Sequence, residues 1–589
     1  MKQFFKFMFA SMLGTILVFV LAFFFFFAFV MLVIAGLETD KTETVRSNTV
    51  LEIKLDHPLP DRTLWEPFSA FRFNFNINKQ SGLNEVLENI RKGAGDENIK
   101  GIFLDLNNFS AGGIATVEAV RNELIKFRGS GKFIIAYGDV ISQSAYYLAS
   151  AADKIYMPPT GMLEFRGAGA ELIFFKNTLD KLEIEPQIFQ YGKYKSAIEP
   201  FRLDKMSPEN REATTGLLKS INEHMIRGIA SGRSLDENAV RNAAENYLIR
   251  FPEDAVRLGF IDSTVYYDQV LEKLKSMSGY TKDRNPRTVS IYDYTSVKGD
   301  HRNSSGQKIA VIYATGDIVN SKGDESQIGS DNITEAIRKC REDESIKAIV
   351  MRVNSPGGDA LVSDLIWREV TLAKKKKPFV VSMGNYAASG GYYISCAADS
   401  IVAEPNTITG SIGVFGIIPN MQKFFKDKLG ITFDRVTTGK YSDIGTVTRP
   451  LTADEKAIIQ REIDRVYETF VKKCAEGRRK SFDEIHSIAQ GRVWTGIQAK
   501  ENGLVDRLGG LADAVRMAAK MAKLKDYRTV EYPGVKPLFE KIMHDFASEA
   551  EAKFIQYRLG ENYKYFEKIE KLNSYNGIMA RMPFELDIH

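Results

Sequence analysis

The sequence has few of the residues that build disulfide frameworks and metal sites. Among its 589 residues are three cysteines, Cys340, Cys396 and Cys474, which lie far apart and form no CxxC pair. Its six histidines are scattered, and none belongs to an HExxH motif or to a similar metal-binding spacing. We therefore expect neither a metal centre nor another bound cofactor.

The sequence also lacks an excess of charge of one sign. Lysine and arginine number 79 and aspartate and glutamate number 75, which leaves a formal net charge of +4. The dense basic cluster at 374–377 directly precedes Pro378 and an apolar stretch, so we interpret it as the solvated end of a helix. Nucleic-acid-binding proteins usually carry a concentrated basic stripe. We expect no nucleic-acid partner.

One long apolar run is present, at the N-terminus. Residues 7–37 carry no charge and are rich in Phe, Val, Leu and Met. About 20 apolar residues in a helix already span a bilayer, whereas the apolar region of a cleaved signal peptide has only about 7–15. The run therefore predicts an uncleaved transmembrane signal-anchor. Because Lys2 and Lys6 precede it, the positive-inside rule leaves residues 1–6 in the cytoplasm and sends the rest of the chain across the membrane.

The remainder of the chain contains the same pattern twice. The matching blocks, in order, are 96–106 with 343–353, 133–139 with 379–385, 145–153 with 391–399, and 255–262 with 499–506. Their separation stays nearly constant, and chance similarity would not keep one register over so many blocks. We predict a tandem duplication with repeats at 48–275 and 308–520, joined by a polar linker at 276–307.

The repeats predict an α/β fold. Short apolar runs rich in β-branched residues alternate with longer helical stretches, and in the second repeat they lie at 309–313, 348–353, 379–382 and 400–403. Strands separated by helices indicate βαβ units and a largely parallel, buried sheet. Beyond residue 520 the chain leaves the repeat. Apolar residues at helical spacing over 537–573 predict a helical extension across 521–589.

The two repeats differ at two positions that carry reactive side chains. Ser389 follows an apolar strand amid small residues, and the register places Gln143 opposite it in the first repeat. Lys195 in the first repeat stands opposite Ser442 in the second. The first repeat thus keeps an amine without the hydroxyl, and the second keeps a hydroxyl without the amine. We predict that Ser389 and Lys195 form one site.

This pair has the chemistry of a serine nucleophile with a lysine base. A serine hydroxyl is a poor nucleophile until a neighbouring base takes its proton, and no histidine lies in these blocks. A lysine can be that base when burial or a nearby cation lowers its pKa from about 10.4 towards neutrality. Ser196, next to Lys195, is a candidate for orienting the amine. Backbone N–H groups must also face the developing oxyanion, and the candidates are Gly357, Gly358 and Gly390.

Several motifs, in order, resemble those of signal peptide peptidase A (SppA) in its long, duplicated bacterial form. They are Asn354-Ser-Pro-Gly-Gly358, Ala388-Ser-Gly-Gly-Tyr-Tyr393, Thr409-Gly-Ser-Ile-Gly-Val414 and Tyr194-Lys-Ser-Ala-Ile-Glu-Pro-Phe201. The resemblance extends over 50–520 and includes the N-terminal anchor. It implies a ClpP/crotonase-like fold for each repeat. In this resemblance Ser389 matches the family nucleophile and Lys195 matches the general base.

The resemblance also implies an activity and a location. SppA proteins are serine peptidases whose Ser–Lys dyad digests signal peptides left in the membrane after preprotein processing. The long form implies a homotetramer, shaped as a bowl that faces the membrane. The expected location is the bacterial inner membrane, crossed once, with the catalytic part on the periplasmic side. The expected partners are signal peptides and other hydrophobic peptides, the lipid bilayer, and further copies of the chain.

Two other interpretations stay open at this point. A crotonase-type acyl-CoA enzyme would also use glycine-rich oxyanion loops, but it would bind CoA and would need no serine nucleophile. The predicted anchor and extracytoplasmic location oppose it, because CoA is a cytoplasmic cofactor. The third interpretation is a non-catalytic membrane scaffold. Failure of a serine-reactive probe to label Ser389 would favour either of them over the peptidase.

Overall fold

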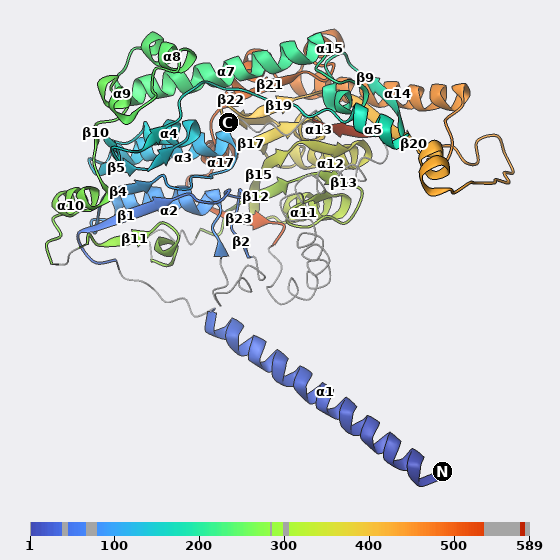
Figure 1. Ribbon diagram of the computed structural model, residues 1–589, viewed down its shortest axis with the longest axis horizontal. Coiled ribbons are helices and arrows are strands. Elements are labelled where there is room, and N and C mark those ends of the chain that lie inside the picture. Colours follow the sequence, from blue (N-terminus) through green and yellow to red (C-terminus); the bar gives the residue numbers. More distant parts are fainter. Residues whose placement is uncertain are drawn as a thin grey trace.

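In the computed structural model, the chain forms two α/β halves that lie side by side, with an N-terminal helix standing apart from them (Figure 1). The structure describes residues 2–37, 45–65, 79–282, 285–297, 305–534 and 578–582. Each half contains a sheet covered by helices on both faces. Parallel strands buried on both faces need apolar side chains on both, which explains the continuous apolar runs in the sequence.

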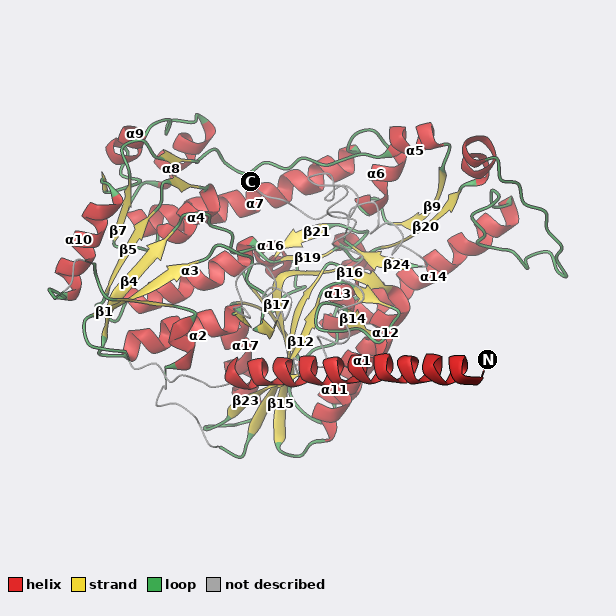
Figure 2. Cartoon of the chain, turned by 60° about the horizontal axis from the view of Figure 1, so that its bottom comes forward, coloured by secondary structure: helices red, strands yellow, loops and turns green. Residues whose placement is uncertain are grey.

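The first half contains a six-stranded sheet in which every neighbouring pair of strands is parallel. In spatial order the strands are β10 (Ser263–Thr264), β7 (Lys154–Met157), β5 (Phe133–Tyr137), β4 (Ile99–Asp105), β1 (Thr49–Lys54) and β11 (Thr288–Ser290). Helices α2 (Leu83–Gly95), α3 (Ile114–Arg128) and α4 (Gln143–Ala149) pack against one face, and α10 (Tyr267–Ser278) packs against the other. Figure 2 shows this sheet edge-on among its helices.

The second half repeats this architecture with eight strands. In spatial order they are β21 (Val493–Thr495), β19 (Ile408–Gly410), β17 (Phe379–Ala388), β15 (Ile346–Ser355), β12 (Lys308–Thr315) and β23 (Arg528–Tyr532), with β18 (Ser400–Ala403) beside β17 and β22 (Arg507–Leu508) beside β18. Helices α11 (Ser330–Glu342), α12 (Ala360–Lys374) and α13 (Gly390–Ser395) cover one face, and α17 (Leu511–Met521) covers the other. The four strands predicted for this repeat are confirmed as β12, β15, β17 and β18.

The remaining elements include a long helix in each half. The first half contains α5 (Lys176–Leu182), α6 (Glu199–Arg202), α7 (Pro208–Arg233), α8 (Glu237–Glu245), α9 (Pro252–Arg257) and the short strands β2 (Leu64–Trp65), β3 (Lys79–Gln80), β6 (Val140–Ile141) and β8 (Met162–Leu163); the second contains α14 (Ala453–Arg478), α15 (Phe482–Ile488) and α16 (Gly496–Glu501). Helix α7 extends across both halves (Figure 1), and its Ser220 hydroxyl lies 2.8 Å from the Thr495 hydroxyl on β21.

Two edge strands lie where the sequence indicated none. Strand β11 belongs to the segment 276–307 that we predicted to be a linker, and β23 lies beyond residue 520. Each pairs in parallel with the first strand of its own half, β11 with β1 and β23 with β12. Both are short and largely polar, so neither carries the apolar signature of a buried strand. The helices predicted over 537–573 lie outside the described residues.

A third sheet joins segments from distant parts of the chain. Its order is β14 (Ile328–Gly329), β13 (Ile318–Val319), β16 (Gly357–Asp359), β24 (Met579–Arg581), β20 (Val414–Asn420) and β9 (Glu185–Tyr191). Strand β9 comes from the first half and pairs antiparallel with β20 over its whole length, from Tyr191 opposite Val414 to Glu185 opposite Asn420. This sheet therefore joins the two halves by hydrogen bonds between their strands.

A buried ion pair also joins the two halves. Arg352, on β15, donates from Nε to Asp61 Oδ1 at 2.8 Å, and both side chains are 4% exposed. Asn354 donates to the other oxygen of Asp61 at 2.8 Å. The Arg352 guanidinium also donates to Ser382 Oγ and to the Met383 carbonyl. Each carboxylate oxygen of Asp61 thus has a donor from the second half.

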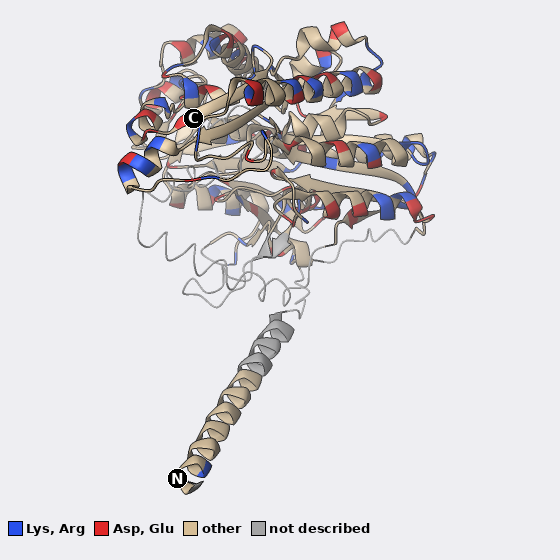
Figure 3. Ribbon diagram, turned by 90° about the vertical axis from the view of Figure 1, so that its right-hand side faces the viewer, with Lys and Arg blue, Asp and Glu red and all other residues tan. Residues whose placement is uncertain are grey.

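In the N-terminal helix α1 (Lys2–Leu37), the part whose side chains the structure describes, residues 3–25, extends away from both halves (Figure 3). Within it, Gln3–Phe25 has a mean hydropathy of 2.4 and is fully exposed. Its length and composition suffice to cross a membrane, and a signal sequence near an N-terminus has the same features. A helix that is apolar on all sides is consistent with membrane anchoring.

Candidate active site

Lys195 follows strand β9, which pairs with the second half, and so lies against that half. The chain leaves β9 at Tyr191, and Lys195 directly precedes the 3₁₀ helix η2 (Ser196–Ile198). The Tyr194 N–H donates to the Gln490 carbonyl at 2.9 Å, which fixes this turn against the second half. A Cβ on Gly491 would lie 2.5 Å from Lys195 Cα, and one on Gly413 would lie 3.1 Å from Lys195 Cδ. Two glycines thus make the room that this lysine occupies.

Ser389 stands where β17 turns into α13. Its φ is 54° and its ψ is −113°, a backbone conformation that non-glycine residues rarely adopt. The Ser389 N–H donates to the Gly410 carbonyl at 2.8 Å, so the turn is held by β19. Strained backbone of this kind costs about 1–3 kcal/mol and occurs most often at functional sites. The side chain is fully buried.

The Lys195 amine lies within hydrogen-bonding distance of the Ser389 hydroxyl. Nζ lies 2.8 Å from Ser389 Oγ, 3.1 Å from Ser411 Oγ and 3.2 Å from the Ser411 carbonyl oxygen. A neutral amine has two N–H groups and one lone pair. If both N–H groups donate to Ser411, the lone pair faces the Ser389 hydroxyl, which then donates its proton towards nitrogen. In that arrangement, Ser411 orients the amine so that its lone pair faces Ser389.

Burial favours the neutral form of Lys195. The side chain is 1% exposed, and this desolvation holds the pKa of the amine well below its ordinary value of 10.5. The ring of Phe415 lies 5.9 Å away, and the contacts described above are to uncharged groups. A charged ammonium in this position would lose its hydration without gaining a carboxylate partner. The environment thus prepares Lys195 to accept a proton.

The structure distinguishes between the three oxyanion candidates. The Gly357 N–H donates to Ser355 Oγ at 3.1 Å, so this group is already engaged. Gly358 lies on β16, opposite Ala580 of β24. Gly390 directly follows Ser389, and its nitrogen lies 2.7 Å from where a Cβ on Gly357 would be. Gly358 and Gly390 are therefore the better placed pair for an oxyanion.

The hydrogen bonds that the structure gives the Lys195 amine are to Ser389 and Ser411, and the other sequence candidates have different contacts. Ser196 begins η2, and its N–H donates to the Tyr194 carbonyl at 2.8 Å. The hydroxyl that the structure places on the Lys195 amine belongs to Ser411 instead. Gln143 begins α4, and its side-chain oxygen accepts from the N–H groups of Arg166 and Gly167. At the position that corresponds to Ser389, the first half thus has an amide that binds a local turn.

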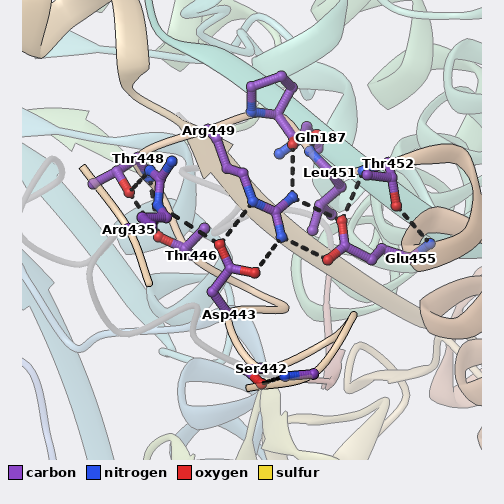
Figure 4. Close-up of polar contacts among 12 residues, drawn as sticks. Gln187, Arg435, Ser442, Asp443, Thr446, Thr448, Arg449, Leu451, Thr452 and Glu455 are labelled. Carbon is purple, nitrogen blue, oxygen red and sulfur yellow. Dashed lines mark hydrogen bonds and ion pairs between the residues drawn. The ribbon is translucent and has the colours of Figure 1, made fainter. Parts of the chain in front are cut away.

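Ser442, the counterpart of Lys195, lies on an exposed arm between β20 and α14, and Figure 4 shows it with Asp443 and Arg449 of the same arm. Its hydroxyl accepts from the Gly439 N–H at 3.0 Å. The arm is fastened by Arg449, which pairs with Asp443 at 2.7 Å and with Glu455 of α14 at 2.6 Å. The block that contains Lys195 therefore forms a buried turn in the first half, whereas the corresponding block of the second half belongs to a surface arm.

Ser411, Gly413 and Gly491 are the site residues that the sequence did not single out. The first two lie in the motif Thr409-Gly-Ser-Ile-Gly-Val414, which was noted only for its resemblance. A serine there could have been suspected because two glycines lie within two residues of it, as two lie within two residues of Ser389. Gly491 gave no signal, because its role depends on contact with Lys195 across nearly 300 residues of chain.

Comparisons with known proteins agree with this geometry. Residues 126–281 and 371–525 each match the family described as peptidase family S49. The chain belongs to peptidase family S49. It is 34% identical to Protease 4 of Salmonella typhi over 546 residues, which cover 90% of this chain and 88% of that protein. It is also 34% identical over 489 residues to the chloroplastic serine protease SPPA of Arabidopsis thaliana, covering 82% of this chain and 70% of that protein.

Membership of family S49 settles two predictions. The two matched segments confirm that the chain is a tandem duplication, and they confirm its resemblance to the long, duplicated form. The chain is a serine peptidase, and the acyl-CoA enzyme and the non-catalytic scaffold are thereby set aside. Its substrates are accordingly peptides.

Proposed function

We propose that this S49 peptidase is a membrane-anchored endopeptidase that degrades signal peptides with Ser389 as nucleophile and Lys195 as general base. The observation that carries the proposal is the 2.8 Å contact between Lys195 Nζ and Ser389 Oγ, made by residues from two different halves. A buried amine with a lowered pKa next to a hydroxyl on strained backbone is the arrangement that activates a serine.

In the proposed reaction, neutral Lys195 takes the Ser389 proton while Oγ attacks the carbonyl carbon of the peptide. The oxyanion of the tetrahedral intermediate accepts hydrogen bonds from the Gly358 and Gly390 N–H groups. The C–N bond breaks as the Lys195 ammonium gives its proton to the leaving amine. A water molecule, deprotonated by the same lysine, then attacks the acyl-enzyme. The carboxylate product leaves, and Ser389 recovers its proton.

The substrate class follows from the surroundings of the site and from helix α1. Ala197, Ile198 and Phe415 form an apolar cluster beside Lys195 and suit an apolar, extended peptide. Helix α1 would hold such a site near peptides that remain in a bilayer, with the two halves on the periplasmic side of a bacterial inner membrane. The relatives named Protease 4 and serine protease SPPA support the serine peptidase activity on which this substrate class depends.

We also propose that the protein is a homotetramer. The arm between β20 and α14 exposes large apolar side chains, among them Leu429, Phe433 and Val436, the last of which is 99% exposed. Figure 1 shows this arm projecting beyond the body at the side opposite α8 and α9. Apolar side chains concentrated on a projecting segment are typical of a protein–protein contact. A second copy of the chain is the partner that this proposal assigns to them.

The rate at which a serine-reactive probe labels Ser389 should rise with pH and level off well below pH 10.5. Only the neutral amine accepts the serine proton, and burial lowers the pKa of Lys195, so the active form already predominates at a lower pH than for an exposed lysine. Labelling can be followed by mass spectrometry of the adduct. Lys195→Arg should show no such rise, because a guanidinium stays protonated throughout. An unchanged profile in Lys195→Arg would remove Lys195 from its proposed role.

Ser411→Ala should lower kcat/KM about tenfold and shift the midpoint of the pH profile, because the variant loses one of the groups that orient the Lys195 amine. A purely structural effect would lower the rate without moving the midpoint. Ser442→Ala is the matched control, since Ser442 is exposed on the arm, and it should behave as the parent protein does. If the Ser411 and Ser442 variants were equally active, Ser411 would have no part in positioning the base.

A further inference from the structure

Strand β24, near the C-terminal end of the chain, lies in the middle of the sheet that carries the site. It pairs antiparallel with β16 on one side and with β20 on the other. Strand β16 contains the oxyanion candidate Gly358, and β20 follows directly after Gly413. Addition of an extended segment between existing strands is a common way of binding a peptide. Residues 578–582 thus occupy the position that an extended substrate would take.

The register of β24 places one peptide carbonyl at the oxyanion candidates. The Ala360 N–H donates to the Ile578 carbonyl at 3.2 Å, and the Met582 N–H donates to the Pro356 carbonyl at 2.7 Å. The alternation of an antiparallel ladder then directs the Gly358 N–H at the carbonyl of Ala580, its partner in the register.

Distances at Gly357 and Gly390 agree with this position of the Ala580 carbonyl. The Ala580 oxygen would lie 2.1 Å from a Cβ on Gly357 and 3.0 Å from a Cβ on Gly390. It is therefore close to the backbone on both sides of the site. The bond that corresponds to a cleaved one joins Ala580 to Arg581.

The side chains around this bond each have a defined environment. Met579 packs with Ala197, Ile198 and Phe415. Ala580 is fully buried, which leaves room for only a small side chain before the bond. Arg581, directly after the bond, donates from Nη1 to Asp317 Oδ2 at 2.9 Å. Its side chain is 7% exposed, so this charge depends on its partner for compensation.

We propose that Asp317 is a specificity-determining residue of the peptidase site and selects a basic residue directly after the cleaved bond. Asp317 lies in the turn between β12 and β13, where its carbonyl accepts from the Ile328 N–H at 2.9 Å. The turn is therefore fixed and presents the carboxylate at one position of the bound strand. A carboxylate there attracts arginine or lysine and repels an acidic side chain. This inference rests on the proposed peptidase function.

The test uses the full-length protein and three peptides. The first contains Ile-Met-Ala-Arg-Met, the sequence of residues 578–582, and the others carry glutamine or glutamate in place of its arginine. Strand β24 competes equally with every peptide, so the ratio of two kcat/KM values on one protein does not depend on how tightly β24 is bound. We expect cleavage after the alanine, mapped by mass spectrometry, and a preference of about tenfold or more for arginine over glutamate.

Substitutions of Asp317 should change this ratio in a set order. Asp317→Asn should bring the peptides close to equal kcat/KM, and Asp317→Lys should invert the preference in favour of glutamate. Asp331→Asn, which removes an exposed carboxylate on α11, is the control and should keep the parental ratio. Because Asp317 is partly exposed, both variants should fold, and their thermal midpoints check this.

Each outcome decides the assignment. Equal cleavage of the three peptides by the parent protein, a preference that survives Asp317→Lys, or cleavage at another bond would overturn the role of Asp317 and leave the peptidase intact. If the parent protein cleaved none of the peptides and no signal peptide, the proposed function itself would fail and the assignment with it.

Discussion

Ser389→Ala should abolish hydrolysis of a synthetic signal peptide, with kcat lower by at least about 10⁴-fold. The substitution removes the atom that we propose as the nucleophile and leaves the proposed oxyanion donors in place, so a small residual rate is the most that binding and polarisation can supply. The fold should persist, because the change deletes one oxygen from a buried site. Hydrolysis in detergent, followed by mass spectrometry of the fragments, measures the effect.

Lys195→Ala should have a similarly large effect, although Lys195 belongs to the other half of the chain. Without the amine, no neighbouring base takes the proton of the Ser389 hydroxyl, which among the described residues can still donate to the Gly413 carbonyl at 3.4 Å. Lys193→Ala is the matched control, because this exposed lysine lies two residues away on the same turn. Parental hydrolysis by either Ser389→Ala or Lys195→Ala would exclude the dyad.

Asp61→Ala should cost about 3–5 kcal/mol of the free energy of unfolding. The substitution leaves the Arg352 guanidinium buried without its carboxylate and deprives Asn354 of an acceptor. Because this ion pair joins the two halves, the loss should also separate Lys195 from Ser389 and lower kcat. Urea unfolding and hydrolysis of the same signal peptide report the two effects.

The control for this substitution is Asp56→Ala. Asp56 lies on the same segment, is exposed, and contacts His57 at the surface. Its removal should change stability by less than about 1 kcal/mol. Equal unfolding free energies for the Asp61 and Asp56 variants would show that the buried pair does not hold the halves together.

Prediction from the sequence succeeded for the strands that are apolar along their whole length. The strands of the second repeat have apolar β-branched residues on both faces, and their pattern identified them correctly. The same pattern failed for β11 and β23, because an edge strand of a few polar residues is held by its neighbour rather than by its own side chains. The role of Ser411 also escaped prediction, whereas Ser196, adjacent to Lys195 in sequence, was favoured instead.

The sequence by itself determined that the chain is a duplication in which each half retains one member of a serine and lysine pair. Composition and register suffice for that, since both are properties of the chain alone. Only the tertiary structure decided how the pair meets, because the contact depends on β9 crossing to β20 and on glycines that admit the lysine. It also decided that β24 lies beside the nucleophile with Ala580 at the oxyanion candidates. Such pairings join segments hundreds of residues apart, and no local pattern in a sequence encodes them.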